Sequence, residues 1–187
     1  MIIFTHDGKE YEFRNNEDEV TLLELAAISD IMNVTDAYFE KWMRVIPILG
    51  SKELAEVIDE EGVISIVEKA NFTNVTNDII ESVEIKGRTY STNVVDGKLK
   101  LSGKDLSLIE KAAKKGGAWI VNAFSIAYKD NDLTNTEHYT EAHIKHKAQL
   151  FGEHLTAKEG APVFFQLQRK LSEHIQRIAD AHAKTVS

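Results

Sequence analysis

Apolar and polar residues alternate in short runs near the start and the middle of the chain, and these runs predict two β-hairpins. Ile2–Thr5 and Tyr11–Phe13 flank an Asp-Gly turn, and Val83–Ile85 and Arg88–Tyr90 flank a Lys-Gly turn. Turn dipeptides that contain glycine accept the positive backbone angles of tight hairpins. A further run, Lys98–Leu101, alternates with period two and predicts another half-buried strand.

The remaining apolar residues recur every three or four positions, as they do on amphipathic helices. Thr21 and Glu24 have the spacing of a capping box, which predicts a helix from there to Met32. Segment 118–128 is apolar nearly all round and predicts a central core helix. The other predicted helices are Asp36–Ile46, one capped by Ser51, Val63–Ala70, Lys104–Lys115, Glu137–Leu155 and Val163–Ala183.

Single residues set the expected helix boundaries. Thr35 is expected to cap the second helix, and Pro47 to end or kink it, because proline lacks an amide hydrogen. Thr136 is expected to cap helix 137–155, and Gly160–Pro162 to separate it from the last helix. One continuous stripe on the last helix is made of Phe164, Leu167, Leu171, Ile175, Ile178 and His182.

These elements predict an α+β fold that is mainly α-helical. Two small β-hairpin or meander elements are each followed by helices, and two long helices close the chain. Residues 1–78 would form an acidic N-terminal lobe and residues 79–187 a mildly basic second lobe. A single continuous domain is the alternative.

Charge is unevenly distributed over the 187 residues, whose net charge is −8. Residues 1–95 carry 8 basic and 19 acidic side chains, whereas residues 96–187 carry 14 and 11. The overall negative charge disfavours binding to nucleic acid. The asymmetry favours a homo-oligomer or a basic partner. The chain has no cysteine, no secretion signal and no apolar run long enough for a membrane span, which fits a cytoplasmic protein.

Four of the seven histidines lie between positions 138 and 154. On an ideal helix, His143 and His146 would lie about 60° apart on neighbouring turns, whereas His138 and His154 would not join them. Zinc needs three or four ligands; a distant residue could supply the rest, but nothing in the sequence points to one. His143 and His146 are therefore weak metal candidates, and we expect neither a metal nor another cofactor.

Other catalytic motifs do not occur in the sequence. There is no phosphate-binding glycine loop and no Gly-x-Ser-x-Gly elbow. The acidic runs Glu17–Glu19 and Asp59–Glu61 lack the ligand spacing of calcium loops and are interpreted as solvated charge. We therefore do not expect an enzyme.

A resemblance rests on the segments GKEYEF, TLLEL, WMRVIPIL, IKGRTY, LSLIEKA and AQLFGEHLTAKEGAPVFFQLQRKLSEHI, taken in that order. Together they resemble small accessory proteins of tailed bacteriophages, especially tail assembly chaperones and related virion-morphogenesis proteins. The likeness is one of pattern and spans most of the chain.

The resemblance implies a non-enzymatic role in the cytoplasm of a bacterial host. Such chaperones coat the long, apolar, helical tape-measure protein until tail-tube subunits polymerise around it. The implied partners are tape-measure or other tail and head proteins of the phage. Candidate contact residues are Tyr38, Phe39, Trp42, Met43, Phe164, Phe165 and Gln168. Each could instead belong to the core, although Phe164 and Phe165 point about 100° apart, which favours an outward position for one of them.

Three alternatives stay open. The chain could be a structural component retained in the virion, as a connector, tail or capsid-associated part. It could be a histidine-based metal-binding protein or a metal-dependent hydrolase that uses His143 and His146. The acidic N-terminal half could also imitate DNA and bind a DNA-binding protein.

Overall fold

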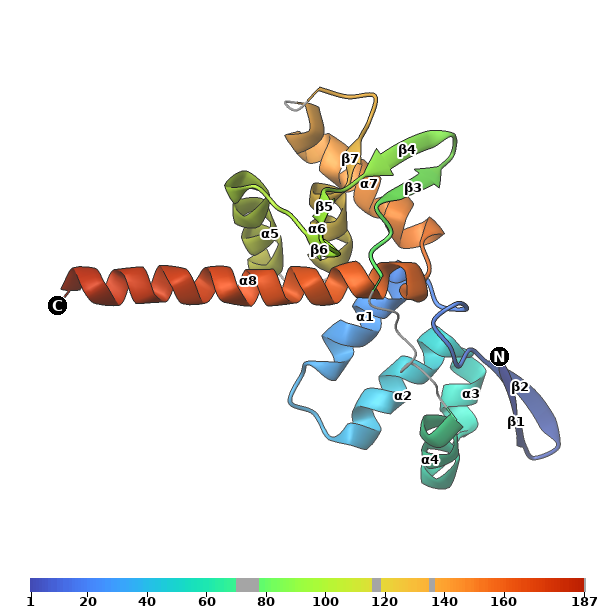
Figure 1. Cartoon of the computed structure of the whole chain (residues 1–187). Coiled ribbons are helices and arrows are strands. Elements are labelled where there is room, and N and C mark those ends of the chain that lie inside the picture. Colours follow the sequence, from blue (N-terminus) through green and yellow to red (C-terminus); the bar gives the residue numbers. More distant parts are fainter. Residues whose placement is uncertain (70–77, 116–118, 135–136, 187) are drawn as a thin grey trace.

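The computed structural model describes residues 1–69, 78–115, 119–134 and 137–186, with side chains as far as residue 180 (Figure 1). It confirms a mainly helical α+β fold with small antiparallel sheets and two long C-terminal helices. The helices are α1 (Leu22–Met32), α2 (Tyr38–Leu49), α3 (Lys52–Val57), α4 (Glu60–Lys69), α5 (Gly103–Lys115), α6 (Trp119–Ala127), the 3₁₀ turn η1 (Glu137–Tyr139), α7 (Glu141–His154) and α8 (Ala157–Val186).

Both predicted hairpins are confirmed. The first pairs β1 (Ile2–His6) with β2 (Lys9–Phe13), and Asp7 and Gly8 both have positive φ in the turn. The second pairs β3 (Ser82–Ile85) with β4 (Arg88–Ser91), and β7 (Lys129–Asp130) adds a third strand. The strand predicted at 98–101 is shorter: β6 (Lys98–Leu99) pairs with β5 (Val94–Val95).

The helix starts in the N-terminal part are partly as predicted. Thr21 and Glu24 form the capping box of α1, and the Ser51 hydroxyl accepts a hydrogen bond from the Leu54 amide at the start of α3. The Thr35 cap is wrong, because α2 begins at Tyr38 and Ala37 precedes it. The fourth helix begins earlier than predicted, because Asp59 accepts a hydrogen bond from the Gly62 amide and so caps it.

Neither proline ends a helix. Pro47 lies in the last turn of α2, which continues to Leu49, so its missing amide removes only one helical hydrogen bond. Pro162 lies inside α8, which begins at Ala157 and not at Val163. The predicted break at residues 160–162 is therefore wrong.

The break before α8 comes at Leu155 and Thr156 instead. The Glu159 carboxylate accepts hydrogen bonds from the Thr156 amide and hydroxyl, and the Glu159 amide donates to the Thr156 hydroxyl. This reciprocal cap starts a helix there. The helix predicted over 137–155 is likewise divided into η1 and α7, and its expected cap, Thr136, lies outside the described residues.

Helix α8 packs on the body only along its first half. Leu167 and Leu171 are buried, but Ile175 and Ile178 are 49% and 39% exposed. Figure 1 shows the C-terminal half of α8 extending away from the other helices. The predicted stripe is thus covered by the protein only as far as Leu171, and the His182 side chain lies outside the described part.

Two apolar cores meet at α1 and α8. One gathers β1, β2 and α2 to α4 around Phe13, Ile46 and Leu54, and the other gathers the second sheet and α5 to α8 around Phe124, Tyr128 and Phe151. Helix α6 is buried nearly all round, as predicted for a central core helix. The predicted lobe boundary at residues 78 and 79 stays a prediction.

Candidate functional site, an apolar groove

An apolar cavity of about 210 Å³ opens between α1, α2 and the first turns of α8. We call it the groove. Its lining residues are Glu17, Leu25, Ile28, Met32, Trp42, Val45, Leu49, Ala157, Ala161, Phe164 and Phe165. All but Glu17 are apolar, so the groove is suited to apolar side chains that would otherwise meet water.

The chain holds α1 against α8 through its backbone. The amide of Leu22 donates to the carbonyl of Leu155, and the amide of Ala157 donates to the carbonyl of Val20. The first residues of α1 and of α8 therefore start from one short antiparallel bridge between Thr21 and Thr156. Ala157 and Ala161 line the groove on the α8 side, and their methyl side chains occupy little of the space between α8 and the other two helices.

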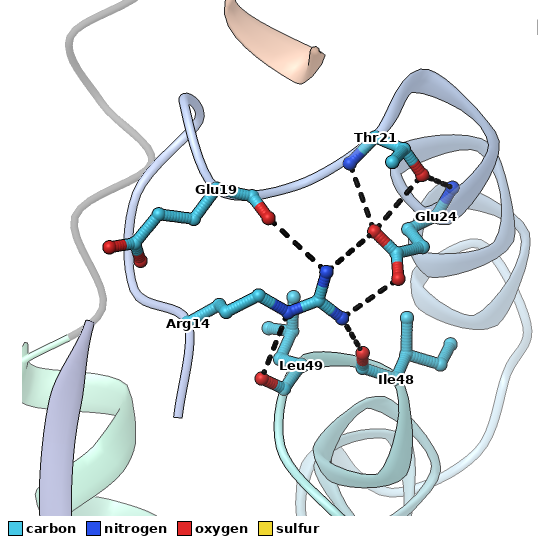
Figure 2. Close-up of polar contacts among 6 residues, drawn as sticks. All are labelled: Arg14, Glu19, Thr21, Glu24, Ile48 and Leu49. Atoms are coloured by element: carbon cyan, nitrogen blue, oxygen red, sulfur yellow. Dashed lines mark hydrogen bonds and ion pairs between the residues drawn. The ribbon is translucent and has the colours of Figure 1, made fainter. Parts of the chain in front are cut away.

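A second device fixes α1 against α2. Figure 2 shows the Arg14 guanidinium between the Glu24 carboxylate and the end of α2. It donates two hydrogen bonds to Glu24, at 2.8 and 2.9 Å, and others to the carbonyls of Glu19, Ile48 and Leu49. We call this arrangement the Arg14 clamp. Through these bonds, the clamp links the loop between β2 and α1, which contains Glu17, to the C-terminal end of α2 at Leu49.

Electrostatics in the clamp favour the ionised glutamate. Burial would raise the pKa of Glu24, but hydrogen bonds from Arg14 and Thr21 outweigh burial and hold the pKa below its usual value. The hydrogen-bonding capacity of both charged partners is therefore used within the protein.

The predicted contact residues from two distant helices come together at the groove. Trp42 and Phe164 are buried in its wall, at 8% exposure each, whereas Phe165 is 53% exposed at its edge. The 100° divergence of the two phenylalanines therefore leaves one outward, as expected. Tyr38 is 63% exposed and its ring packs edge-on against Trp42.

The other predicted contact residues lie beside the groove. Phe39 is exposed on α2, and Met43 is half-buried against the N-terminal core. Gln168 is exposed on α8, one turn after Phe164. These three side chains do not line the cavity, so they would reach only a partner larger than the cavity itself.

One lining residue was missed by sequence reasoning. Glu17 belongs to the acidic run predicted to be solvated, yet it is only 7% exposed. Nothing in its sequence position distinguishes it from Asp18 and Glu19. Its burial results from the fold, because the loop between β2 and α1 passes beneath α8, where the Lys158 amide donates to the Glu17 carbonyl.

One histidine lies differently from the helical-wheel expectation. His138 belongs to η1, and its ring lies beside that of His143, with ring centroids 6.2 Å apart. His146, the partner expected for His143, is exposed. His138 departs from its expected direction because residues 137–139 form a 3₁₀ turn, to which the α-helical angle per residue does not apply. His154 contacts the carbonyl of its own helix at Leu150.

A buried lysine next to these histidines was also missed. Lys147 is fully buried and its ammonium donates to the Tyr128 carbonyl at 2.7 Å. Burial lowers the pKa of Lys147 to about 8, although the nearby Asp130 opposes this shift. Asp130 is itself fully buried and bonded to Arg88 at 3.1 Å. Burial and the charge of Lys147 in turn lower the pKa values of His138 and His143.

The described residues offer no group of three or more histidines, aspartates or glutamates that could hold one metal ion. Within the same ranges, no helix is both long and apolar enough to cross a membrane. Comparison with known proteins found no family model, no curated protein and no solved structure that matches the chain.

Proposed function

We propose that the chain is a non-enzymatic bacteriophage assembly protein that holds an apolar helix of a partner in the groove. Its action would be that of a tail assembly chaperone, with a tape-measure-type protein as partner in the host cytoplasm. The observation that carries the proposal is the groove itself. Ten apolar side chains line it, and both helices that carry the predicted contact residues, α2 and α8, form walls of it together with α1.

The surroundings of the groove support a helical ligand. Exposed aromatic side chains lie along its edge, with Phe165 on α8 and Tyr38 and Phe39 on α2. Grooves that receive amphipathic helices take a few large anchor residues inside and contact the rest of the ligand along their edges. Aromatic residues that are exposed next to such a groove are typical of protein interfaces.

Self-association is a second part of the proposal. Leu171, Ile175 and Ile178 follow one another at steps of four and three residues, and the latter two are exposed on the projecting half of α8. Such spacing suits the seam of a helix pair. A second copy of α8 would cover the stripe, and replacing both isoleucines with glutamate should lower the molar mass measured by light scattering to that of one chain.

Photo-crosslinking in infected cells tests the main proposal. A benzophenone amino acid would replace Phe165, with Ile64 as the matched control because it is 52% exposed on α4 and does not line the groove. We expect position 165, and not position 64, to capture a long helical phage protein. Equal capture at both positions, or capture of no such protein, would count against the groove as the docking site.

The protein content of mature particles separates the two phage roles. A chaperone is expected to be absent from them. Stoichiometric presence of the chain would favour the structural virion component instead.

A further inference from the structure

Two polar atoms beside the apolar groove are buried without a partner. They are Oε1 of Glu17 and Nε1 of Trp42, and neither has a hydrogen-bond partner among the described residues. Glu17 is 7% exposed and Trp42 is 8% exposed, and both line the cavity. One is a carboxylate oxygen, which accepts hydrogen bonds, and the other is an indole N–H group, which donates one.

A buried carboxylate oxygen without a hydrogen-bond partner opposes folding, because no protein group replaces the hydration that it loses. Other carboxylates in the same part of the molecule have hydrogen-bond or ion-pair partners. Glu24 is bonded to Arg14, and Asp18 pairs with Lys158 at 3.0 Å. Lys158 follows Ala157 in α8 but is occupied by Asp18. The unpartnered Oε1 of Glu17 is thus a feature of the residues around the groove, whereas the carboxylates of Asp18 and Glu24 have partners.

We infer that the groove recognises its helix by charge as well as by shape. The preferred ligand carries a large apolar anchor and, about one turn away, a lysine or arginine that pairs with Glu17. A carbonyl or hydroxyl oxygen of the same ligand accepts the Trp42 indole hydrogen. This inference rests on the proposed function and specifies the partner chemistry at that site.

The size of the cavity fits a single anchor. A closed apolar cavity of about 150 Å³ holds one benzene ring, so 210 Å³ accommodates a phenylalanine, leucine or methionine side chain. Residues three or four apart on a helix lie side by side. An anchor inside the cavity therefore places a residue four positions away at the cavity wall, where a basic side chain can reach a lining carboxylate.

The distribution of charge favours a cationic ligand over an anionic one. Residues 1–95, which include Glu17 and Trp42, carry 19 acidic and 8 basic side chains. A long-range negative potential of this kind attracts basic partners and repels acidic ones. Charge complementarity thus acts in the same direction as the unpartnered carboxylate.

A set of short helical peptides tests the inference. The reference peptide has blocked ends, an alanine- and glutamine-based sequence, one phenylalanine and a lysine four residues later. In the first matched peptide glutamine replaces the lysine, and in the second alanine replaces the phenylalanine. Fluorescence anisotropy gives the affinity of each for the full chain. Because hydrogen bonds to charged groups contribute about 1.5–3 kcal/mol, glutamine in place of lysine should weaken binding by about tenfold or more.

Two variants assign the preference to Glu17. In Glu17→Gln the lysine and glutamine peptides should bind alike, whereas Asp18→Asn should keep the full preference because Asp18 is exposed and does not line the groove. Far-UV circular dichroism and thermal unfolding confirm that both variants fold. If wild-type protein binds the lysine and glutamine peptides equally, the charge inference fails while the docking proposal stands. If it binds neither of them, both fail.

Discussion

Two glutamates in the N-terminal part of the chain, seven positions apart, have opposite surroundings. The side chain of Glu24 is 28% exposed and accepts hydrogen bonds from Arg14 and Thr21. Glu17 is more deeply buried, and its Oε1 has no partner in the described part of the chain. The charges of Arg14 and Glu24 thus pair with each other and hold helices together, whereas Oε1 of Glu17 at the groove has no such partner among the described residues. A buried polar atom that the fold leaves without a partner calls for an explanation, and a ligand contact is the one proposed above.

The largest effect is expected where the clamp is broken. Arg14→Met removes the guanidinium that joins Glu24 to the end of α2, so we expect the free energy of unfolding to fall by about 3 kcal/mol. Chemical denaturation measures it. Arg44→Met is the matched control, because Arg44 forms a more exposed pair with Asp36 and such pairs contribute about 0–1 kcal/mol. A similar loss in both variants would show that the clamp is no more than a surface pair.

At the groove, we expect a substitution to raise the free energy of unfolding instead of lowering it. Glu17→Gln removes a buried charge without breaking an ion pair in the described part of the chain, so the free energy of unfolding should rise by about 1 kcal/mol. The measurement is the same denaturation series, with Asp18→Asn expected within about 0.5 kcal/mol of wild type. Destabilisation by Glu17→Gln would mean that Glu17 has a structural role, and the contrast with Glu24 would disappear.

A smaller effect, a pH-dependent change in the free energy of unfolding, is expected at the histidines, away from the groove. Burial, followed by the charge of Lys147, lowers the pKa values of His138 and His143 from 6.5. The unfolded chain therefore binds more protons than the folded chain below pH 6.5, and stability is lost as the pH falls through this range. The carboxylates with lowered pKa values, such as Glu24, begin to contribute only near and below 4.5.

Chemical unfolding between pH 6.5 and 4.5 measures this loss. His143→Gln should flatten the pH dependence, because it removes one of the two histidines whose pKa is lowered. Peptide affinity at the groove should not follow the same histidine titration. An unchanged slope in His143→Gln would show that another group is responsible.

Local chemistry made much of the fold predictable. The Asp7-Gly8, Lys86-Gly87 and Asp96-Gly97 turns all have positive φ at both residues, and the glycine in each accepts this angle without steric cost. The capping box of Thr21 and Glu24 likewise depends only on residues three apart. These features need no information about distant parts of the chain.

Features that depend on tertiary contacts were not predictable. The sequence around Pro162 predicts a break, but the Thr156 and Glu159 cap starts α8 earlier and the first turns of the helix are then buried against α1. Lys147 is buried because its ammonium reaches the carbonyl of Tyr128 on a neighbouring segment.

The candidate site was predictable in part. The aromatic residues of α2 and α8 were proposed as contacts from the resemblance to tail assembly chaperones. Their meeting at one groove, and the burial of Glu17 beside them, follow from the packing of α1 between them. One acidic residue within a run of three carries no local signal that distinguishes it.

Titration of the reference peptide against three proteins tests the docking role of the groove most directly. They are wild type, Phe165→Asp at the groove edge, and Ile64→Asp at an equally exposed site on α4. We predict that Phe165→Asp loses at least about tenfold in affinity, because anchor residues at interfaces contribute about 2 kcal/mol or more and tenfold corresponds to about 1.4 kcal/mol. Ile64→Asp should bind like wild type. Equal affinity in all three proteins, or no binding by wild type, would contradict a docking role for the groove.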